Sequence, residues 1–290
     1  MSRALAWLEL LRPQQWVKNG FVLAGLLFGH GWRDPELAFA AATATAAFCL
    51  GSGAVYAFND SRDAAADRGH PDKRRRPVAR GAVSPREAYA LAAASAAAGL
   101  ALAAWAAWAV AAILGAYLAL NLAYTLGLKR VPVLDVILIA SGFMLRLLAG
   151  TAGIGIEPSR WLMACGFLLT LFLGFAKRRA ELSALAADAA QHRPVLGAYS
   201  IAFLDRAIGA CAAGMAASYA FYTMAGETVA LHGTGDLVYT VPWVLLGTAR
   251  YLYRLRHQGG GGDPTEELLR DPLLGAAVLG WVATVLWVIG

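Results

Sequence analysis

Charge is scarce in this chain of 290 residues: Asp, Glu, Lys and Arg together make up 15%, against about 25% in an average soluble domain. Hydrophobic residues make up 59%, and the mean hydropathy is +0.53. A single globule of this size cannot enclose that much apolar surface. The composition therefore excludes an ordinary soluble protein and predicts one that lipid solvates.

Cysteine is also scarce. Cys49, Cys165 and Cys211 are the three cysteines, and each lies in an apolar run. An odd number of cysteines placed in this way excludes a secreted scaffold built on disulfides. The net charge of +6 does not indicate a nucleic-acid partner, because in a membrane protein the distribution of basic residues among the loops carries the information.

Long apolar runs dominate the chain. A helix that crosses a bilayer needs about 20 mostly apolar residues, and nine segments approach that length. They lie at roughly 18–32, 37–57, 87–108, 110–127, 133–153, 160–176, 203–225, 237–252 and 272–289. We expect an all-α bundle of nine transmembrane helices, forming one domain over residues 1–290. An apolar stripe near the N-terminus predicts a short helix along the membrane surface.

Basic residues are distributed unevenly between the two sides of this bundle. Of the 25 Lys and Arg residues, all except Arg33, Arg146 and Arg160 lie near the N-terminus or in the connections 58–86, 128–132, 177–206 and 250–270. By the positive-inside rule these segments face the cytoplasm, and the C-terminus lies outside. The sequence therefore predicts a multi-pass protein of the cytoplasmic (inner) membrane.

Polar residues recur with helical spacing at the cytoplasmic end of the second span. Tyr56, Asn59, Asp60, Asp63 and Asp67 fall on one helix stripe. Stacked carboxylates repel one another, and Mg²⁺ relieves the repulsion by accepting carboxylate and amide oxygens, water and substrate phosphates. We expect Asn59, Asp60, Asp63 and Asp67 to bind Mg²⁺ and to be catalytic, with Tyr56 beside the substrate. The alternative is an acidic, solvated helix end.

A run of four cations, residues 73–76, follows this stripe. Next to a Mg²⁺ site, a basic loop typically closes over a phosphate or diphosphate. Lys73, Arg74 and Arg76 are therefore candidates for binding substrate. Anchoring of the loop to anionic lipid is the alternative.

Two further cytoplasmic segments combine basic and acidic residues. They contain Tyr124, Lys129, Arg130 and Asp135 around the connection 128–132, and Lys177, Arg178 and Glu181 at the end of the sixth span. We expect these residues to bind substrate. Glu181 lies four residues after Lys177 and is expected to hold the lysine in place. Membrane anchoring alone would account for part of this set.

Two cations lie within the apolar spans themselves. Arg146 lies well inside the fifth span, where a cation is costly and by default marks a functional site; a structural pair with Asp135 is the alternative. Lys18 enters the first span and either joins the site or extends to the membrane interface. Both are candidates for binding a substrate phosphate.

These residues resemble the motifs of the UbiA superfamily of intramembrane prenyltransferases. The spacing Asn59-Asp60-x-x-Asp63-x-x-x-Asp67 is similar to the first aspartate-rich motif of that superfamily, and Tyr124 to Arg130 resembles another of its segments. The likeness covers essentially the whole chain. It implies a nine-helix bundle whose cavity faces the cytoplasm and whose activity depends on Mg²⁺.

The chain departs from the superfamily at one motif. Members that prenylate aromatic rings carry a second aspartate-rich motif after the sixth span, where this chain has Lys177–Glu181. The segments Arg12–Asn19, Lys73–Pro77 and Ser141–Arg146 resemble one branch, whose members transfer phosphoribose. That likeness implies 5-phosphoribosyl 1-diphosphate as the donor and a polyprenyl (decaprenyl) phosphate as the acceptor, for the synthesis of a cell-wall arabinan precursor.

Electrostatics favours the same substrates. This donor and acceptor together present a diphosphate and two monophosphates, which need more fixed cations than one diphosphate does. One alternative is an aromatic prenyltransferase that uses a polyprenyl diphosphate donor for quinone or haem synthesis. Another is a transporter or lipid-phosphate binding protein without chemistry, although the outer connections carry almost no charge for a polar exit. The prenyl chain length and the oligomeric state, a homo-oligomer included, stay open.

Overall fold

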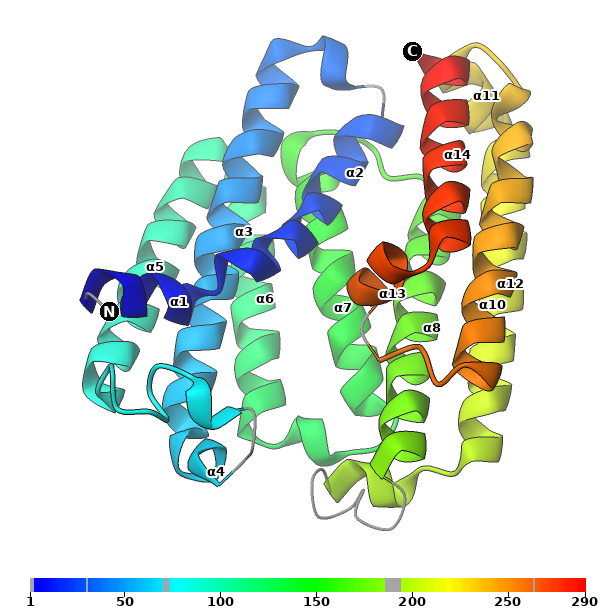
Figure 1. Ribbon diagram of the computed structural model, residues 1–290. Coiled ribbons are helices and arrows are strands. Elements are labelled where there is room, and N and C mark those ends of the chain that lie inside the picture. Colours follow the sequence, from blue (N-terminus) through cyan, green and yellow to red (C-terminus); the bar gives the residue numbers. More distant parts are fainter. Residues whose placement is uncertain (1–2, 30, 70–72, 186–193, 263) are drawn as a thin grey trace. The chain divides into compact units, whose positions relative to one another are not determined.

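The structure is a computed structural model that describes residues 3–29, 31–69, 73–185, 194–262 and 264–290 (Figure 1). Every regular element in these residues is a helix, which confirms the expected all-α fold. The α-helices are α1 (Arg3–Leu11), α2 (Gly20–Phe28), α3 (Pro35–Arg62), α4 (Ala64–Arg68), α5 (Pro85–Ala106), α6 (Trp108–Leu126), α7 (Leu134–Ala149), α8 (Arg160–Leu185), α10 (Ile201–Met224), α11 (Gly226–His232), α12 (Val241–His257), α13 (Pro264–Arg270) and α14 (Pro272–Ile289). Short 3-10 helices join them: η1 (Pro13–Asn19), η2 (Gly31–Arg33), η3 (Lys73–Arg75), η4 (Leu128–Arg130), η5 (Ala152–Ile154), η7 (Pro194–Ala198) and η8 (Asp236–Thr240).

Seven helical segments of the described chain are long and apolar enough to cross a membrane, as expected of an integral membrane protein. They are Pro35–Arg62, Pro85–Ala106, Trp108–Leu126, Leu134–Ile154, Arg160–Ala184, Ile201–Met224 and Pro272–Ile289. Each corresponds to a span expected from the sequence. The helix expected over 160–176 continues as α8 to Leu185, so Lys177 and its neighbours are helical.

The other two expected spans, 18–32 and 237–252, are not among these seven. Pro13 begins a 3-10 helix that continues to Asn19, and α2 keeps nine residues, about 14 Å of helix against a hydrocarbon core of about 30 Å. α12 has 17 residues and a basic last turn. The predicted count of nine spanning helices is therefore not confirmed.

The chain divides into two compact units. Unit 1 comprises Met1–Leu126 and Leu145–Pro158, and unit 2 comprises Gly127–Met144 and Ser159–Gly290. The boundary falls within α7, which contributes its first part to unit 2 and its last turns to unit 1. A single domain over residues 1–290 stays a prediction.

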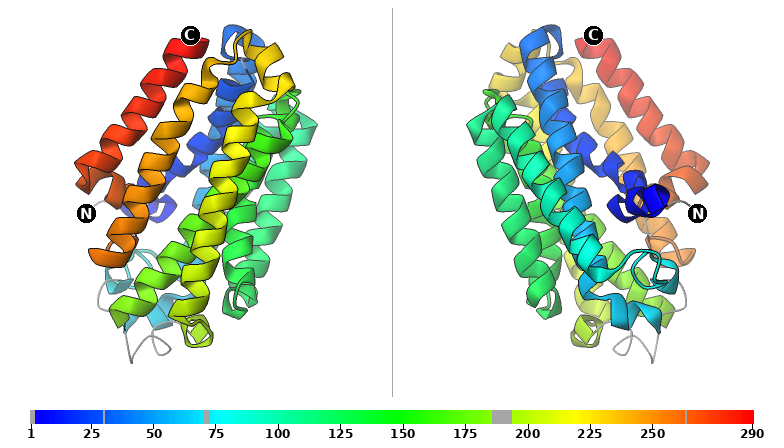
Figure 2. Two further views of the ribbon diagram at one scale, coloured as in Figure 1. Left: turned by 90° about the vertical axis from the view of Figure 1, so that its right-hand side faces the viewer. Right: turned by 90° about the vertical axis from the view of Figure 1, so that its left-hand side faces the viewer.

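In unit 1, α3, α5 and α6 lie side by side, and α1 crosses α3 and α5 (Figures 1 and 2). The interior of this unit is built largely from small side chains, with Ala41, Ala44 and Ala47 of α3 fully buried. Small residues let helices approach closely in lipid, where packing drives their association. Phe48 of α3 packs on Tyr117 of α6 at 5.4 Å between ring centroids.

In unit 2, α8 runs along α10 and α12 runs along α14 (Figure 2). Larger side chains form its core, including Phe172 and Phe175 of α8 and Leu204 and Ile208 of α10. Tyr251 of α12 packs on Phe172 at 5.3 Å between ring centroids. This core holds the helices that carry the second group of expected site residues.

A capping side chain followed by proline begins three of the long helices. Asp34, Ser84 and Asp271 each stand before a proline, and each side chain accepts a hydrogen bond from a backbone N–H of the first turn of α3, α5 or α14. A capping oxygen followed by proline at the first helical position satisfies the exposed N–H groups there. The ends of these helices are therefore encoded locally.

In unit 1, α2 crosses the end of α7 at two glycines. A Cβ on Gly25 would collide with the carbonyl oxygen of Gly150, and a Cβ on Gly150 would collide with the carbonyl oxygen of Val22. Only glycine permits this approach. The crossing brings Asn19, directly before α2, to Arg146 of α7 at 2.7 Å.

Gly150→Ala is expected to lower the free energy of unfolding by about 3 kcal/mol, because the added methyl group overlaps backbone that has no room to move. Gly115→Ala in α6 is the matched control, since a Cβ there meets nothing within 4 Å. Alanine favours a helix over glycine by about 1 kcal/mol, so the control should be as stable as the wild type or more so. Thermal denaturation in detergent measures both, and equal midpoints would contradict the close approach.

Candidate active site

The aspartate-rich segment lies where α3 ends and α4 begins. Asp63 separates the two helices, and its backbone N–H donates to the Asn59 carbonyl at 2.9 Å while its carbonyl accepts from the Asp67 N–H at 2.9 Å. Bonds between residues four apart keep the α-helical register. Residues 59–67 therefore follow one nearly continuous helical path, as their spacing predicted.

Asp60 is held by two arginines. Its side chain is 1% exposed, and its Oδ1 accepts from Nη2 of Arg12 at 2.6 Å and lies 3.2 Å from Nη1 of Arg76. Its Oδ2 is buried and has no hydrogen-bond partner among the residues that the structure describes. An unpaired buried carboxylate oxygen is costly, and a bound cation would remove that cost.

Arg12 is a residue that the sequence did not single out. Its backbone is left-handed, with φ of 52°, and its guanidinium lies 4.8 Å from the centroid of the Tyr56 ring. A non-glycine residue keeps such a conformation where its surroundings impose it. The contacts with Asp60 and Tyr56 supply that constraint. No local spacing predicts the Arg12–Asp60 pair, because the two residues lie 48 positions apart.

Arg76 connects two carboxylates of the segment. Its Nη1 lies 2.8 Å from Oδ2 of Asp67 and 3.2 Å from Oδ1 of Asp60. Asp60 and Asp67 therefore share one side of the helical path, and a guanidinium offsets their mutual repulsion. Lys73 and Arg74, in η3, are exposed. Arg75 is exposed as well, so the loop combines one cation fixed on carboxylates with three at the surface.

Asn59 and its neighbours on α6 complete this part of unit 1. The Asn59 side-chain oxygen accepts from the Thr125 hydroxyl at 2.6 Å, which orients the amide. Tyr124 precedes Thr125 and is half-buried, as is Asp63. The segment therefore places one oriented amide and several carboxylates within nine residues.

This donor set fits Mg²⁺. The described ranges contain no group of three or more His, Cys, Asp or Glu side chains already placed to hold a metal ion. Mg²⁺ does not require such a cage, because it takes one or two carboxylates and fills its shell with water and phosphate oxygens. Asn59, Asp63 and Asp67 offer those oxygens, and the unpartnered Oδ2 of Asp60 lies in the same segment.

Arg146 lies in the buried part of unit 1, with an exposed fraction of 6%. Its Nε donates to Oδ1 of Asn19 at 2.7 Å, and its Nη2 donates to the Tyr117 hydroxyl at 2.9 Å. The alternative pair with Asp135 does not form, because eleven residues along α7 separate the two by about 16 Å. Lys18, in η1 directly before Asn19, is half-buried.

In unit 2, Asp135 and Arg178 form a buried ion pair. Their exposed fractions are 0% and 2%, and Nε of Arg178 donates to Oδ2 of Asp135 at 2.7 Å. Nη1 of Arg178 donates to Glu181 at 2.7 Å. The expectation that Glu181 holds Lys177 is therefore corrected: Glu181 pairs with Arg178 three residues away, and Lys177 is exposed. Two carboxylates offset the charge of Arg178.

Tyr199 joins this pair from the end of η7, and sequence reasoning missed it. Its hydroxyl donates to Oδ1 of Asp135 at 2.6 Å and accepts from the Val133 N–H at 2.6 Å. Burial, and next the hydrogen bond to Asp135, raise the pKa of Tyr199. The hydroxyl therefore keeps its proton and stays a donor to Asp135 at neutral pH.

The remaining expected cations of unit 2 lie at the surface. Lys177 of α8 and Arg130 of η4 are exposed, and Lys129 of η4 is partly exposed. Unlike Arg178, these side chains reach the surface of the protein. Of the four basic residues of unit 2 that were expected in the site, one is therefore buried and three are exposed or partly exposed.

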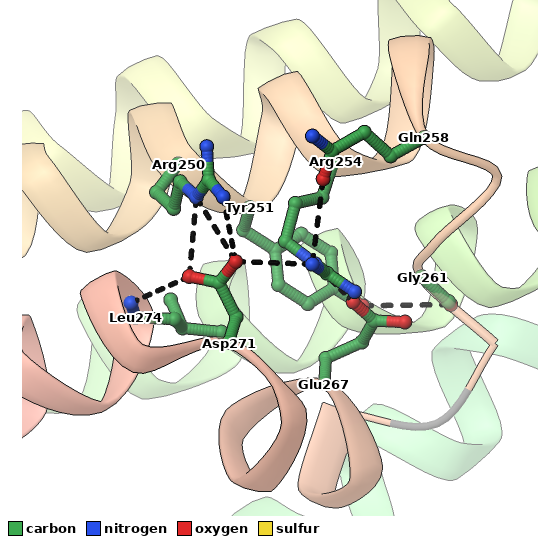
Figure 3. Close-up of polar contacts among 8 residues, drawn as sticks. All are labelled: Arg250, Tyr251, Arg254, Gln258, Gly261, Glu267, Asp271 and Leu274. Carbon is green, nitrogen blue, oxygen red and sulfur yellow. Dashed lines mark hydrogen bonds and ion pairs between the residues drawn. The ribbon is translucent and has the colours of Figure 1, made fainter.

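A further charged cluster joins α12, α13 and α14 (Figure 3). Arg254 donates to Glu267 at 2.6 Å and to Asp271 at 3.0 Å, and Arg250 donates to Asp271 at 2.7 Å. Asp271 also accepts from the Leu274 N–H at 2.8 Å. The hydrogen bond from Arg250 is the main cause that holds the pKa of Asp271 below its usual range. These four charges pair with one another and tie three helices together.

Three comparisons place the chain among known proteins. Residues 20–263 match the model of the UbiA prenyltransferase family. The chain is 35% identical to the decaprenyl-phosphate phosphoribosyltransferase of Corynebacterium glutamicum, over 95% of this chain and 84% of that protein. It is 33% identical to the protein of the same name from Mycolicibacterium smegmatis, over 96% and 90%. A UbiA homolog from Archaeoglobus fulgidus, with GPP and Mg2+ bound, shares the fold at a TM-score of 0.73 and 20% identity, over 98% and 99%.

The all-helical membrane fold and the aspartate-rich segment are those of an intramembrane transferase. The family match and the relatives agree with that class. The chain belongs to the UbiA prenyltransferase family.

Truncating two neighbouring side chains of α8 to alanine is expected to change the free energy of unfolding by different amounts. Arg178→Ala leaves Asp135 buried without its cation, which should lower the free energy of unfolding by about 3–5 kcal/mol. Lys177→Ala removes an exposed side chain and should change stability by no more than about 0.5 kcal/mol. Thermal denaturation of both variants in detergent is the measurement. A wild-type melting temperature for Arg178→Ala would show that the buried pair does not support the fold.

Proposed function

We propose that the protein transfers 5-phosphoribose from 5-phosphoribosyl 1-diphosphate to a polyprenyl phosphate and releases diphosphate, in a reaction that depends on Mg²⁺. The observation that carries this proposal is the identity of 33–35% to decaprenyl-phosphate phosphoribosyltransferases over nearly the whole chain. The lipid acceptor would be decaprenyl phosphate, and the product a precursor of cell-wall arabinan.

The charges of α8 support this choice over an aromatic prenyltransferase. Residues 177–181 carry three cations and one carboxylate, and that carboxylate is engaged by Arg178. Residues 177–181 therefore offer no unengaged carboxylate to a second Mg²⁺. An exposed lysine suits a phosphate monoester instead, and the phosphoribosyl donor carries one that a prenyl diphosphate lacks.

In unit 1, Asn59, Asp63 and Asp67 would hold Mg²⁺, with Asp60 contributing through Oδ2 or a water molecule. Bound there, the ion neutralises the donor's diphosphate and makes it a better leaving group. Lys73 and Arg74, which are exposed, bind the outer diphosphate oxygens. Arg76 stays close to both the carboxylates and the leaving group, and Tyr56 positions Arg12 beside Asp60.

The acceptor phosphate is already anionic at pH 7, so the reaction needs no general base. Catalysis then consists of positioning and of cations that stabilise the departing diphosphate. Lys18, Arg146, Lys129, Arg130 and Lys177 are the residues we assign to the ribose 5-phosphate and the acceptor phosphate. In unit 2 the Asp135–Arg178–Glu181 group ties α7 to α8, and in unit 1 Tyr124 stays a candidate for substrate binding.

We further propose that the protein resides in the cytoplasmic membrane with these residues facing the cytoplasm. The donor is a soluble, highly charged metabolite, and its access requires the cytoplasmic side. The concentration of Lys and Arg in alternate connections agrees with this orientation.

The test of the function is a reaction with two donors. Purified protein in detergent receives radiolabelled 5-phosphoribosyl diphosphate with a polyprenyl phosphate, or a prenyl diphosphate with an aromatic acid, each with Mg²⁺ or with EDTA. We expect labelled lipid only in the first reaction, and only with Mg²⁺. Prenylation of the aromatic acid alone would reject the proposal and favour an aromatic prenyltransferase, and no turnover of either would favour a binding protein.

Asp63→Ala should reduce phosphoribosyl transfer to below about a tenth of the wild-type rate, because loss of a metal ligand typically costs 10–100-fold or more. Asp63 is half-buried at a helix junction, so the variant should still fold. Asp236→Ala, which removes an exposed carboxylate at the start of η8, is the control and should keep full activity. Activity of Asp63→Ala above that limit would remove Asp63 from the metal site.

Lys177→Asp places an acidic residue where aromatic prenyltransferases carry their second aspartate-rich motif. It places a carboxylate where we expect a phosphate, and like-charge contacts of this kind cost about 2–5 kcal/mol. Transfer of phosphoribose should fall, and no aromatic prenylation should appear. Full transfer would make Lys177 a membrane anchor only, whereas a gain of aromatic prenylation would contradict the proposed function itself.

A further inference from the structure

Val133 forms a strained turn directly before α7. Its φ is 67°, and the Leu134 N–H donates to the Pro132 carbonyl across it at 2.8 Å. This is the pattern of a three-residue γ-turn with positive φ, which is rare and strained. For a β-branched residue such a backbone conformation is an outlier. Strain of this kind persists only where the surrounding structure imposes it.

Tyr199 contacts the strained residue directly. The Val133 N–H donates to the Tyr199 hydroxyl at 2.6 Å, and the same hydroxyl donates to Asp135 at 2.6 Å. Asp135 is fixed in turn by Arg178 at 2.7 Å. One hydroxyl therefore connects the strained backbone to a buried ion pair, and all four residues belong to unit 2.

The turn lies between α7 and a pair of cations. Lys129 and Arg130 lie in η4, and Val131 and Pro132 separate that helix from Val133. The η4 helix packs against η7, the helix that ends directly before Tyr199. A change of φ at Val133 would redirect the chain between η4 and α7, and Lys129 and Arg130 would move with it.

We propose that Tyr199 is a positioning residue that holds the γ-turn at Val133 and thereby fixes Lys129 and Arg130 for binding a substrate phosphate. The inference rests on the proposed function for the identity of that phosphate, which belongs to 5-phosphoribosyl diphosphate or to the lipid acceptor. Tyr199 itself touches neither substrate. A purely structural role is the competing explanation, and the two differ in what glycine at position 133 does.

The experiment compares four variants: Tyr199→Phe, Val133→Gly, the double variant, and Tyr219→Phe as the matched control. Tyr219 is a buried tyrosine of the same unit whose hydroxyl also has two partners, Thr240 and Trp281, both at 2.7 Å. Both Phe variants lose one hydroxyl with two hydrogen bonds. Only Tyr199→Phe releases a strained turn.

Tyr199→Phe should raise the KM for one phosphate substrate about tenfold and leave kcat nearly unchanged. This result is expected when the lost interaction stabilises the bound substrate and the transition state equally. Val133→Gly should restore most of this loss in the double variant, because glycine adopts positive φ without penalty. Val133→Gly alone and Tyr219→Phe should keep the wild-type KM. Raising donor and acceptor concentrations separately identifies which phosphate is bound.

Three results would overturn the proposal: an unchanged KM in Tyr199→Phe, an equal rise in Tyr219→Phe, or no recovery in the double variant. Melting temperatures of the same variants form a double-mutant cycle that needs no substrate. If the wild type does not transfer phosphoribose, the proposed function fails. The cycle then still tests whether Tyr199 holds the turn at Val133, and additive effects would refute it.

Discussion

A charge buried among apolar helices must be offset by an opposite charge or by hydrogen bonds, since the penalty for removing it from water is several kcal/mol per ion. Asp60, Arg146 and Arg178 are the clearest cases. Arg12 and Arg76 offset Asp60, Asp135 and Glu181 offset Arg178, and Asn19 and Tyr117 accept hydrogen bonds from Arg146. The arrangement of the other polar residues around the site depends on these contacts.

This constraint separates the basic residues into two kinds. Arg12, Arg76 and Arg178 are fixed on carboxylates, and in our account they hold the structure of the site. Lys73, Arg74, Arg130 and Lys177 are exposed, and in our account they bind the phosphates. The Arg250–Arg254 cluster belongs to the first kind, because its two cations pair with Glu267 and Asp271 and join α12, α13 and α14.

The sequence predicted whatever depends on local spacing. Apolar runs located seven spans, and the 59–67 spacing placed Asp60 and Asp67 on one side of a helical path. It did not predict Arg12 or Tyr199, whose partners lie 48 and 64 positions away. Lys177 and Arg178 were also predicted to have the same role, because two adjacent basic residues in a sequence do not indicate which side chain is buried. Residue roles in the site stay predictions, whereas the family and the all-α fold are confirmed.

A structure with 5-phosphoribosyl diphosphate and Mg²⁺ bound would test the central claim most directly, namely that arginines fixed on carboxylates hold the protein and exposed cations bind the substrate. The account predicts phosphate oxygens at hydrogen-bond distance, about 3 Å, from exposed cations such as Lys177 or Arg130. It also predicts that Arg178 keeps its contact with Asp135. A donor phosphate bound directly to Arg178, with the Asp135 pair broken, would contradict it.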